Sequence, residues 1–309
     1  MILCGDVGGT KTLLGVAEQG QLIANRRYAN ADFPDFAALL ASFFNDTHTV
    51  PASLKGGCLA LAGPIADDGN TARLTNLPWT IAAPELAQCF GMPIPRLVND
   101  FAAAAVGAVS ASAQQRVMLQ AGEPLVAAPR LVVGAGTGLG MAIVLPEGNG
   151  WRCIAGEGGH VAFAPADAQQ ATLWAHLNRR HGRVTWERVV SGPGLTSIHE
   201  FLAGEILSPD QITDQAKAVP SSHAGRAVDM FLSAYGAFAG DMALACLARG
   251  GVFLAGGIAG KLLDLLPESG FLAAFGAKAE HAAIAARMPV HVGTDPLLGL
   301  RGALILAVD

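Results

Sequence analysis

Short apolar runs separated by polar turns predict a chain in which strands and helices alternate. Three apolar runs follow one another directly within residues 1–29, which indicates an antiparallel meander. The strands expected in the first third of the chain are Ile2–Val7, Thr12–Glu18, Gln21–Arg27, Gly57–Leu61, Thr71–Leu74 and Pro95–Val98. The helices expected there are residues 34–46, Pro84–Phe90 and Phe101 to about Val109. Strands joined by helical crossovers are typical of a mixed α/β sheet.

The same order of elements begins again after Leu131. The strands expected here are Leu131–Val133, Met141–Leu145, Trp151–Ile154, Val252–Ala255 and Val290–Val292. The expected helices are Gln169–Arg180, Val184–Val190, Leu195–Leu202, Pro209–Lys217 and two longer ones near residues 225–249 and 296–308. This restart predicts two α/β lobes, each a mixed sheet with helices: a small lobe over residues 1–110 and a large lobe over residues 111–309. The last helix is a candidate to pack back on the small lobe.

Two glycine-rich loops that contain threonine stand about 125 residues apart. The first glycine loop is Gly5-Asp6-Val7-Gly8-Gly9-Thr10, and the second glycine loop is Gly134-Ala135-Gly136-Thr137-Gly138-Leu139-Gly140. Glycine lets the backbone approach an anion and aim N–H groups at it, and threonine adds a hydroxyl donor. Neither loop matches a Walker A motif or a dinucleotide fingerprint. A single loop of this kind is also explained as an ordinary hairpin turn. Two such loops in one chain favour a cleft whose two walls hold one polyphosphate.

Composition limits the partners that the protein can have. Hydrophobic residues make up 51% of the 309 residues and charged residues only 15%. This charged fraction lies below the roughly 25% typical of soluble domains. A chain with so few charges has much apolar surface to bury, so we expect a homodimer with an apolar interface. The net charge is −5 and the basic residues form no cluster, which argues against nucleic acid and anionic membranes as partners.

The cysteines and the chain start bear on the compartment. Five cysteines are scattered along the chain, and this odd number without paired spacing argues against disulfides and a zinc cluster. The chain starts with a strand and no basic segment, so we expect no signal peptide. The longest apolar stretch, near residues 131–146, is too short and too rich in glycine to span a membrane. We therefore expect a cytoplasmic protein.

Six motifs stand out along the chain: GDVGGTKT (5–12), LVNDFAAAAVG (97–107), VVGAGTGLGMA (132–142), AGEGGHVAFAP (155–165), ERVVSGPGL (187–195) and VFLAGGIAG (252–260). Their order and spacing are those of bacterial glucokinases, and the sequence resembles that family over its whole length. The resemblance implies a two-lobed actin-like ATPase fold, which is ribonuclease H-like. It also implies transfer of a phosphoryl group from ATP, with Mg²⁺, to the 6-hydroxyl of D-glucose, the entry step of glycolysis.

The resemblance also assigns roles to single residues. Asp100 would be the general base that accepts the proton of the sugar 6-hydroxyl, and Asn99 would bond a ring hydroxyl. Glu157, His160 and Glu187 would bind other sugar hydroxyls. The residues assigned to ATP are Gly5, Asp6, Val7, Gly8, Gly9 and Thr10, then Gly136, Thr137 and Gly138, and finally Gly256 and Gly257 on the adenosine side. Asp6 would also position Mg²⁺, through water.

Plainer explanations stay open for each of these side chains. Asp100 could be a helix N-cap with Asn99 as a turn residue. Asp6 could be a residue of the hairpin turn. Glu157 and His160 could belong to a polar loop in which the histidine caps a carbonyl group, and Glu187 could lie on a solvated helix face.

The relatives of the glucokinases supply the rival functions. A related sugar kinase and repressor family shares the fold but carries a cysteine-rich zinc motif, and here His160 is followed by Val161-Ala162-Phe163 without such a cluster. We therefore expect no structural zinc. The alternatives are a kinase for another hexose or amino sugar, an actin-like ATPase that changes conformation, or a sugar sensor without catalysis. ATP and polyphosphate both fit such loops as the phosphoryl donor.

Overall fold

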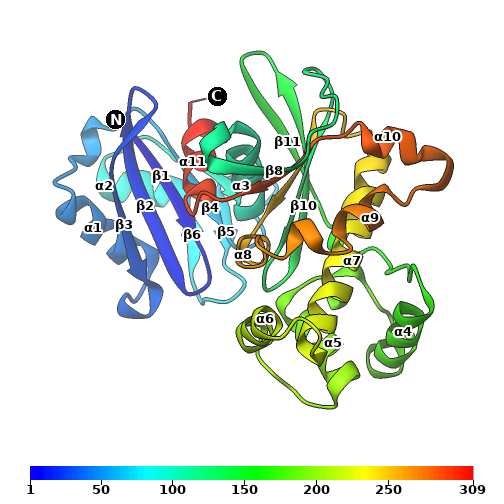
Figure 1. The fold of residues 1–309 in the computed structure, drawn as a ribbon. Coiled ribbons are helices and arrows are strands. Elements are labelled where there is room, and N and C mark those ends of the chain that lie inside the picture. Colours follow the sequence, from blue (N-terminus) through cyan, green and yellow to red (C-terminus); the bar gives the residue numbers. More distant parts are fainter. Residues whose placement is uncertain (309) are drawn as a thin grey trace. The chain divides into compact units, whose positions relative to one another are not determined.

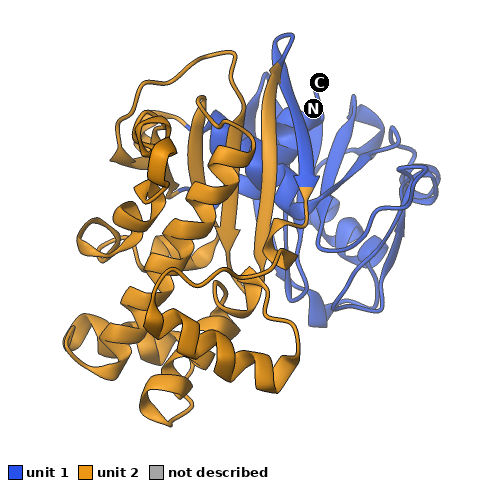
Figure 2. Cartoon of the chain, turned by 90° about the vertical axis from the view of Figure 1, so that its right-hand side faces the viewer, with its two compact units in different colours: residues 1–111, 147–155, 295–309 blue, residues 112–146, 156–294 orange. Residues whose placement is uncertain are grey.

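The computed structural model describes residues 1–308, which form two compact units (Figures 1 and 2). The first unit comprises residues 1–111 and 147–155 and the C-terminal segment from Asp295. The second unit comprises residues 112–146 and 156–294. The sequence placed a single boundary after residue 110, whereas the chain crosses between the units several times.

A five-stranded mixed sheet forms the centre of the first unit, with strand order β3-β2-β1-β4-β7. Its strands are β1 (Ile2–Val7), β2 (Lys11–Glu18), β3 (Gln21–Ala29), β4 (Gly57–Leu61) and β7 (Arg96–Asn99). The pairs β1–β2 and β2–β3 are antiparallel, which confirms the predicted meander, and β4 is parallel to both β1 and β7. Strands β5 (Thr71–Arg73) and β6 (Thr80–Ala82) form a separate two-stranded ribbon, of which the sequence predicted only the first strand.

Side chains alternate between the two faces of this sheet, and each face has its own core. Leu3 belongs to a cluster with Phe43 of α1, whereas the next residue, Cys4, belongs to a cluster with Val106 of α3 and Leu300 of α11. The helices of this unit are α1 (Phe36–Asp46), α2 (Ala83–Phe90), α3 (Asp100–Ser110) and α11 (Leu298–Leu306). Most of strand β11 (Gly150–Gly156) is also in this unit, and its Trp151 packs against the second cluster.

Helices α3 and α11 cross at very short range because glycine stands at the crossing on both. A Cβ atom on Gly302 of α11 would overlap the carbonyl oxygen of Ala103. A Cβ atom on Gly107 of α3 would overlap the carbonyl oxygen of Leu298. Helix α11 also packs against β1, and α3 packs against β4 and β7.

In the second unit, strands β10, β9, β12, β13 and β8 are neighbours in that order. They are β10 (Leu139–Glu147), β9 (Arg130–Ala135), β12 (Gly251–Ala255), β13 (Val290–Gly293) and β8 (Arg116–Gln120), and β8 was missed by the sequence analysis. The helices are α4 (Ala168–His181), α5 (Gly192–Ala203), α6 (Pro209–Ala218), α7 (His223–Ala245), α8 (Gly257–Lys261), α9 (Phe271–Gly276) and α10 (Ala282–Ala286). Short 3-10 turns are η1 (Asn30–Asp32), η2 (Pro51–Ser53), η3 (Ala113–Gln115), η4 (Gly158–His160), η5 (Trp186–Arg188), η6 (Leu266–Glu268) and η7 (Ala279–His281).

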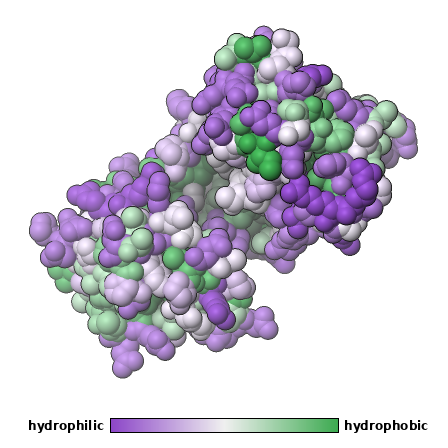
Figure 3. All heavy atoms as spheres, turned by 90° about the horizontal axis from the view of Figure 1, so that it is seen from below, coloured by the Kyte–Doolittle hydropathy of each residue, from purple (hydrophilic) through white to green (hydrophobic). Residues whose placement is uncertain are grey.

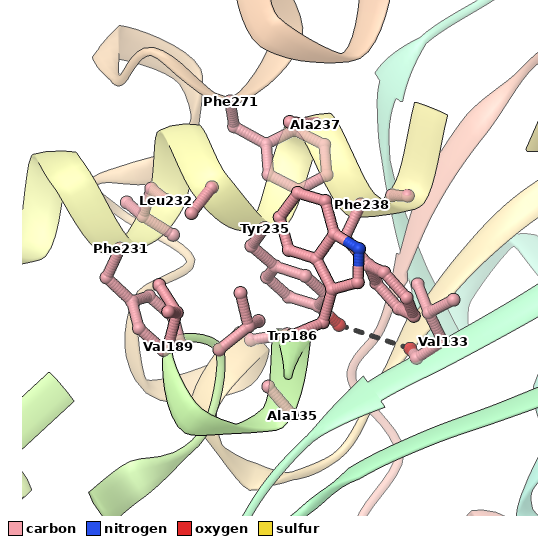
Figure 4. Close-up of a cluster of buried hydrophobic side chains, with 14 of the residues drawn as sticks. Val133, Ala135, Trp186, Val189, Phe231, Leu232, Tyr235, Ala237, Phe238 and Phe271 are labelled. Carbon is pink, nitrogen blue, oxygen red and sulfur yellow. Dashed lines mark hydrogen bonds between the residues drawn. The ribbon is translucent and has the colours of Figure 1, made fainter. Parts of the chain in front are cut away.

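The long helix α7 supplies much of the core of this unit (Figure 4). Its aromatic side chains pack between the sheet and α9, and the ring of Tyr235 lies edge-on to Phe271 at 5.6 Å between centroids. The fully buried Tyr235 hydroxyl donates to the Val133 carbonyl oxygen at 3.2 Å. A buried hydroxyl without a partner would weaken the fold, so this bond fixes where α7 sits on β9.

The helix predicted over Val184–Val190 is wrong. Only the 3-10 turn η5 forms there, because the backbone on either side has other partners. Phe163 donates its N–H to Val184 in an extended pairing, and Ser191 caps the start of α5. Glu187 is therefore on a short turn and not on a helix face.

The surface mixes hydrophilic and hydrophobic residues on the face seen in Figure 3. Large exposed apolar side chains occur in both units, for example Ile23, Met118 and Ile206. None of the helices within residues 1–308 is both long and apolar enough to cross a membrane. The homodimer stays a prediction from composition.

Gly302→Ala is expected to destabilise the fold by about 1–3 kcal/mol, the usual effect of forcing a methyl group into a packed contact. The added Cβ meets backbone on α3, which cannot rotate away. Urea unfolding followed by circular dichroism measures the change. Gly276→Ala in α9 is the matched control, since no atom lies within 4 Å of the added Cβ. Equal midpoints for Gly302→Ala and wild type would contradict the close crossing.

Candidate active site

The first glycine loop is a tight hairpin between β1 and β2, braced by a buried asparagine. Gly8 donates its N–H to the Lys11 carbonyl at 3.0 Å and closes the turn. Asn30, only 1% exposed, donates its side-chain amide to the Gly8 carbonyl at 2.8 Å and accepts from the Thr12 hydroxyl at 2.8 Å. Its backbone N–H also donates to the Thr10 carbonyl. Sequence reasoning missed Asn30, because nothing in the local sequence shows that it lies under the loop.

Asp6 lies within β1, in the part of the first glycine loop that is extended, and the turn itself begins at Gly8. Its interpretation as a turn residue is therefore wrong. Burial raises the pKa of the Asp6 carboxyl to about 6, from its usual 3.8, because an ionised group loses water contacts there. The nearby charge of Asp100 raises the pKa further, and Arg27 opposes both effects. Two carboxyl groups from different elements therefore lie within electrostatic reach of each other.

Asn99 and Asp100 lie where β7 ends and α3 begins. The helix cap is Asn99 and not Asp100: the Asn99 side-chain oxygen accepts the N–H groups of Phe101 at 3.0 Å and Ala102 at 3.2 Å. Asp100 is the first residue of the helix, and its carboxylate accepts the Phe101 N–H at 2.8 Å. Burial raises the pKa of Asp100, while the backbone N–H groups and the Asn99 amide oppose the shift. The cap thus fixes the backbone that carries Asp100.

Gly299, in the first turn of α11, lies directly against Asp6. A Cβ atom at this position would overlap one carboxylate oxygen of Asp6. Only glycine leaves the carboxylate where it is, since any side chain would push it aside. Nothing in the local sequence indicates this contact, because residues 6 and 299 are at opposite ends of the chain.

The second glycine loop is the hairpin between β9 and β10 in the second unit. Gly136 donates its N–H to the Gly138 carbonyl at 2.8 Å, and Thr137 at the tip is exposed. Gly256 follows β12 with a positive φ of 84°, and a Cβ there would come within 2.6 Å of the Ala135 carbonyl oxygen. The structure therefore brings the second loop and the late glycine pair together.

A cavity of about 690 Å³ opens beside this loop, entirely within the second unit. Its lining includes Gly136, Thr137, Gly257, Ile258, Pro193 and Ile206. Two ion pairs, Arg180–Glu200 at 2.8 Å and Lys261–Asp210, also contribute side chains to the wall. A lining that combines part of a glycine-threonine loop with apolar side chains suits a ligand with both phosphate and a flat ring.

Glu157 and His160 lie on the turn that follows β11. His160 Nε2 is 3.8 Å from Glu157 Oε2, and both side chains are well exposed. The turn packs tightly on β10, because a Cβ on Gly159 would overlap the Leu139 carbonyl oxygen. Just beyond it, Trp186 donates its N–H to the Val161 carbonyl at 3.0 Å, which holds η5 beside the turn.

Glu187 completes this group. Its Oε2 accepts the N–H of Leu139, the first residue of β10, at 2.9 Å. Glu187 is partly buried, so its interpretation as a solvated helix residue is wrong. The candidate sugar residues Glu157, His160 and Glu187 therefore gather around the end of the second glycine loop, while Asp6, Asn99 and Asp100 gather in the first unit.

Comparison with known proteins identifies the family. The family model described as Glucokinase matches residues 3–309. The chain belongs to the glucokinase family. A glucokinase of Trichormus variabilis is 36% identical over 340 aligned residues, which cover 99% of this chain and 98% of the relative. A glucokinase of Chromohalobacter salexigens is also 36% identical, covering 97% of this chain and 95% of the relative.

A solved structure extends the relationship to the fold. The crystal structure of a glucokinase from an Antarctic psychrotroph matches with a TM-score of 0.88 at 30% identity, covering 99% of this chain and 98% of that chain. Membership in the glucokinase family confirms the resemblance seen in the motifs, and the predicted actin-like ATPase fold is confirmed with it.

Asp6→Asn is expected to stabilise the fold at pH 8 and to change it little at pH 4. The raised pKa means that ionised Asp6 weakens the folded state, and this loss develops as the pH rises from about 4 to about 6. Asparagine carries no charge, so the free energy of unfolding should rise by on the order of 1–3 kcal/mol at pH 8. Urea unfolding at both pH values measures it.

The control for this experiment is Asp67→Asn, which removes an exposed carboxylate from a loop of the same unit. It should leave the urea midpoint unchanged at both pH values. An Asp6→Asn protein no more stable than wild type at pH 8 would show that ionised Asp6 does not weaken the folded state.

Proposed function

We propose that this protein transfers a phosphoryl group from ATP to the 6-hydroxyl of D-glucose, giving ADP and glucose 6-phosphate. Membership in the glucokinase family over the whole chain supports this activity. The observation that carries the proposal is the pair of desolvated carboxyl groups, Asp6 and Asp100, beside the first glycine loop. Phosphoryl transfer to an alcohol needs such groups, one to orient and deprotonate the alcohol and one to help hold the metal.

Asp100 is the proposed general base. As the sugar oxygen bonds to the γ-phosphorus and the bond to the β-phosphate oxygen breaks, the hydroxyl proton passes to the Asp100 carboxylate. Burial raises the pKa of Asp100, and a more basic carboxylate accepts a proton more readily. The Asn99 cap holds the start of α3, so the base stays in one position.

Asp6 is the proposed residue for Mg²⁺, acting through bound water. The chemistry of the site fits a hard cation, because the half-buried Asp6 carboxylate stands near the end of β1, just before the hairpin turn that is proposed to hold phosphate. When bound, Mg²⁺ would neutralise charge on the phosphates. A cation there would also lower the pKa of Asp6 and so favour its ionised form.

The nucleotide is proposed to occupy the cavity of the second unit. Gly136, Thr137 and Gly257 line this cavity. The loop residues Gly136, Thr137 and Gly138 would bind phosphate, and Gly256 and Gly257 would lie at the adenosine side. In the first unit, the phosphates would meet the loop residues Gly5, Asp6, Val7, Gly8, Gly9 and Thr10. The apolar side chains of Pro193, Ile206 and Ile258 would cover the base.

Glucose hydroxyls are proposed to bond Asn99, Glu157, His160 and Glu187. Each hydroxyl both donates and accepts, so carboxylates and an imidazole can read several of them at once. A site of this kind rejects sugars that lack one of the hydroxyls, because its own polar groups are then left unpaired. Action in the cytoplasm as a homodimer, without structural zinc, stays a prediction from the sequence.

An assay across sugars tests the proposal. ADP release is followed with glucose, mannose, fructose, N-acetylglucosamine and N-acetylmannosamine, and glucose is expected to give the highest kcat/KM. A preference for another sugar would favour the rival hexose or amino-sugar kinase. ADP release that no sugar accelerates would favour an actin-like ATPase, and sugar binding without turnover would favour a sensor. Replacing ATP by polyphosphate tests the donor.

Asp100→Asn is expected to bind glucose but to lose roughly 10²–10⁴-fold in kcat, the range for removal of a general base. The amide keeps the size of the side chain but cannot take up the hydroxyl proton. Glu85→Gln, which removes an exposed carboxylate from the first turn of α2, is the control and should keep full activity. A kcat within tenfold of wild type would remove Asp100 from this role.

A further inference from the structure

We propose that Glu187 is a positioning residue for the second glycine loop, so that a single carboxylate serves both the sugar and the nucleotide phosphates. The proposal rests on the function proposed above, since it takes the loop to hold phosphate. It adds a direct connection between two sites that the sequence motifs keep apart. All of its contacts lie within the second unit.

The first contact is between the Glu187 side chain and the end of the loop. The Leu139 N–H donates to Glu187 Oε2 at 2.9 Å. The same oxygen lies over the loop, because a Cβ on Gly138 would come within 2.6 Å of it. A charged acceptor on a backbone N–H gives one of the stronger hydrogen bonds available to a protein. Glu187 therefore fixes where the loop ends and β10 begins.

A second contact holds the other side of the loop. Gly192, five residues after Glu187, donates its N–H to the Gly136 carbonyl at 2.8 Å. Ser191 stiffens the segment between the two contacts: its hydroxyl donates to the Glu187 carbonyl at 2.7 Å and accepts the Gly194 N–H at 3.1 Å. Residues 187–192 thus hold both ends of the loop, and the tip with Thr137 is left exposed.

The segment is anchored in the core by the residue before Glu187. Trp186 is 2% exposed and packs between aromatic rings, with a centroid distance of 4.9 Å to Phe163. On its other side the Phe238 ring lies at 5.5 Å (Figure 4). A buried tryptophan held this way cannot move without opening a cavity. The position of the Glu187 carboxylate, and with it that of the loop, is set by the core of the second unit.

One carboxylate can bond both the loop and a sugar hydroxyl, because it has two oxygens with several acceptor positions. The bond from Leu139 uses one of these positions and leaves others for a sugar hydroxyl. A sugar bound to Glu187 would restrict the carboxylate that positions the loop. The binding of sugar and nucleotide should then be coupled, each favouring the other by the same factor.

The test is calorimetric titration of ADP in the absence of sugar. Glu187→Ala removes the acceptor of the Leu139 N–H, and the affinity for ADP should fall by on the order of 10–100-fold. Glu187→Gln keeps an oxygen that can accept this N–H, so ADP affinity should return close to the wild-type value. Glu280→Ala is the matched control, because it removes an exposed carboxylate of the second unit that does not line the cavity. It should bind ADP like wild type.

Two outcomes would overturn the proposal: unchanged ADP affinity in Glu187→Ala, or equal losses in Glu187→Ala and Glu187→Gln. Glucose titration of the same proteins separates this proposal from the proposed function. Weaker ADP binding with unchanged glucose binding would keep the loop role and remove Glu187 from the sugar site. If wild type phosphorylates no sugar while Glu187→Ala still loses ADP affinity, the proposed function fails and the positioning role stands.

Discussion

The site depends on backbone segments that approach one another so closely that only glycine fits at the points of contact. At Leu139 the carbonyl oxygen lies against Gly159 and the N–H donates to Glu187. The turn that carries Glu157 and His160 and the second glycine loop therefore share one residue of β10. In the first unit, Gly302 lets α11 cross α3 at backbone contact. Each glycine increases the conformational entropy that the chain loses on folding. What the close approach gains is that the polar groups of the site lie on or beside rigid helices and strands and not on free loops.

Polar groups at the site are held at some expense to stability. Burial and the neighbouring charge of Asp100 raise the pKa of Asp6 to about 6, so near neutral pH the folded protein holds an ionised group in an unfavourable place. A sequence selected for stability alone would have a neutral side chain there. The same desolvation strengthens the attraction of the carboxylates for a cation or a proton, which a phosphoryl-transfer site uses. The core of the first unit supplies the stability that offsets this loss.

Much of the fold could be predicted because its signals are local. Runs of five or six mostly apolar residues predicted the bounds of β1 and β4 correctly, and the spacing of the glycines predicted both hairpin loops. Residues 184–190 were predicted wrongly because extended pairing with Phe163 overrides their helical pattern. Asn30 and Gly299 were not predicted at all. Their importance comes from contacts with residues far away in sequence, and a single sequence holds no record of such contacts.

The motif around Glu187 illustrates what the structure adds to a resemblance. By sequence it is one more sugar contact, assigned by analogy and independent of the phosphate loops. In the structure the same carboxylate accepts a backbone N–H of the loop, and Gly192 at the other end of the motif donates back to it. A side chain that already bonds a rigid loop loses little further conformational entropy when a ligand binds, because folding has already ordered it. The position of the Glu187 carboxylate and the order of the second glycine loop then have one physical origin, the packing of Trp186 in the core.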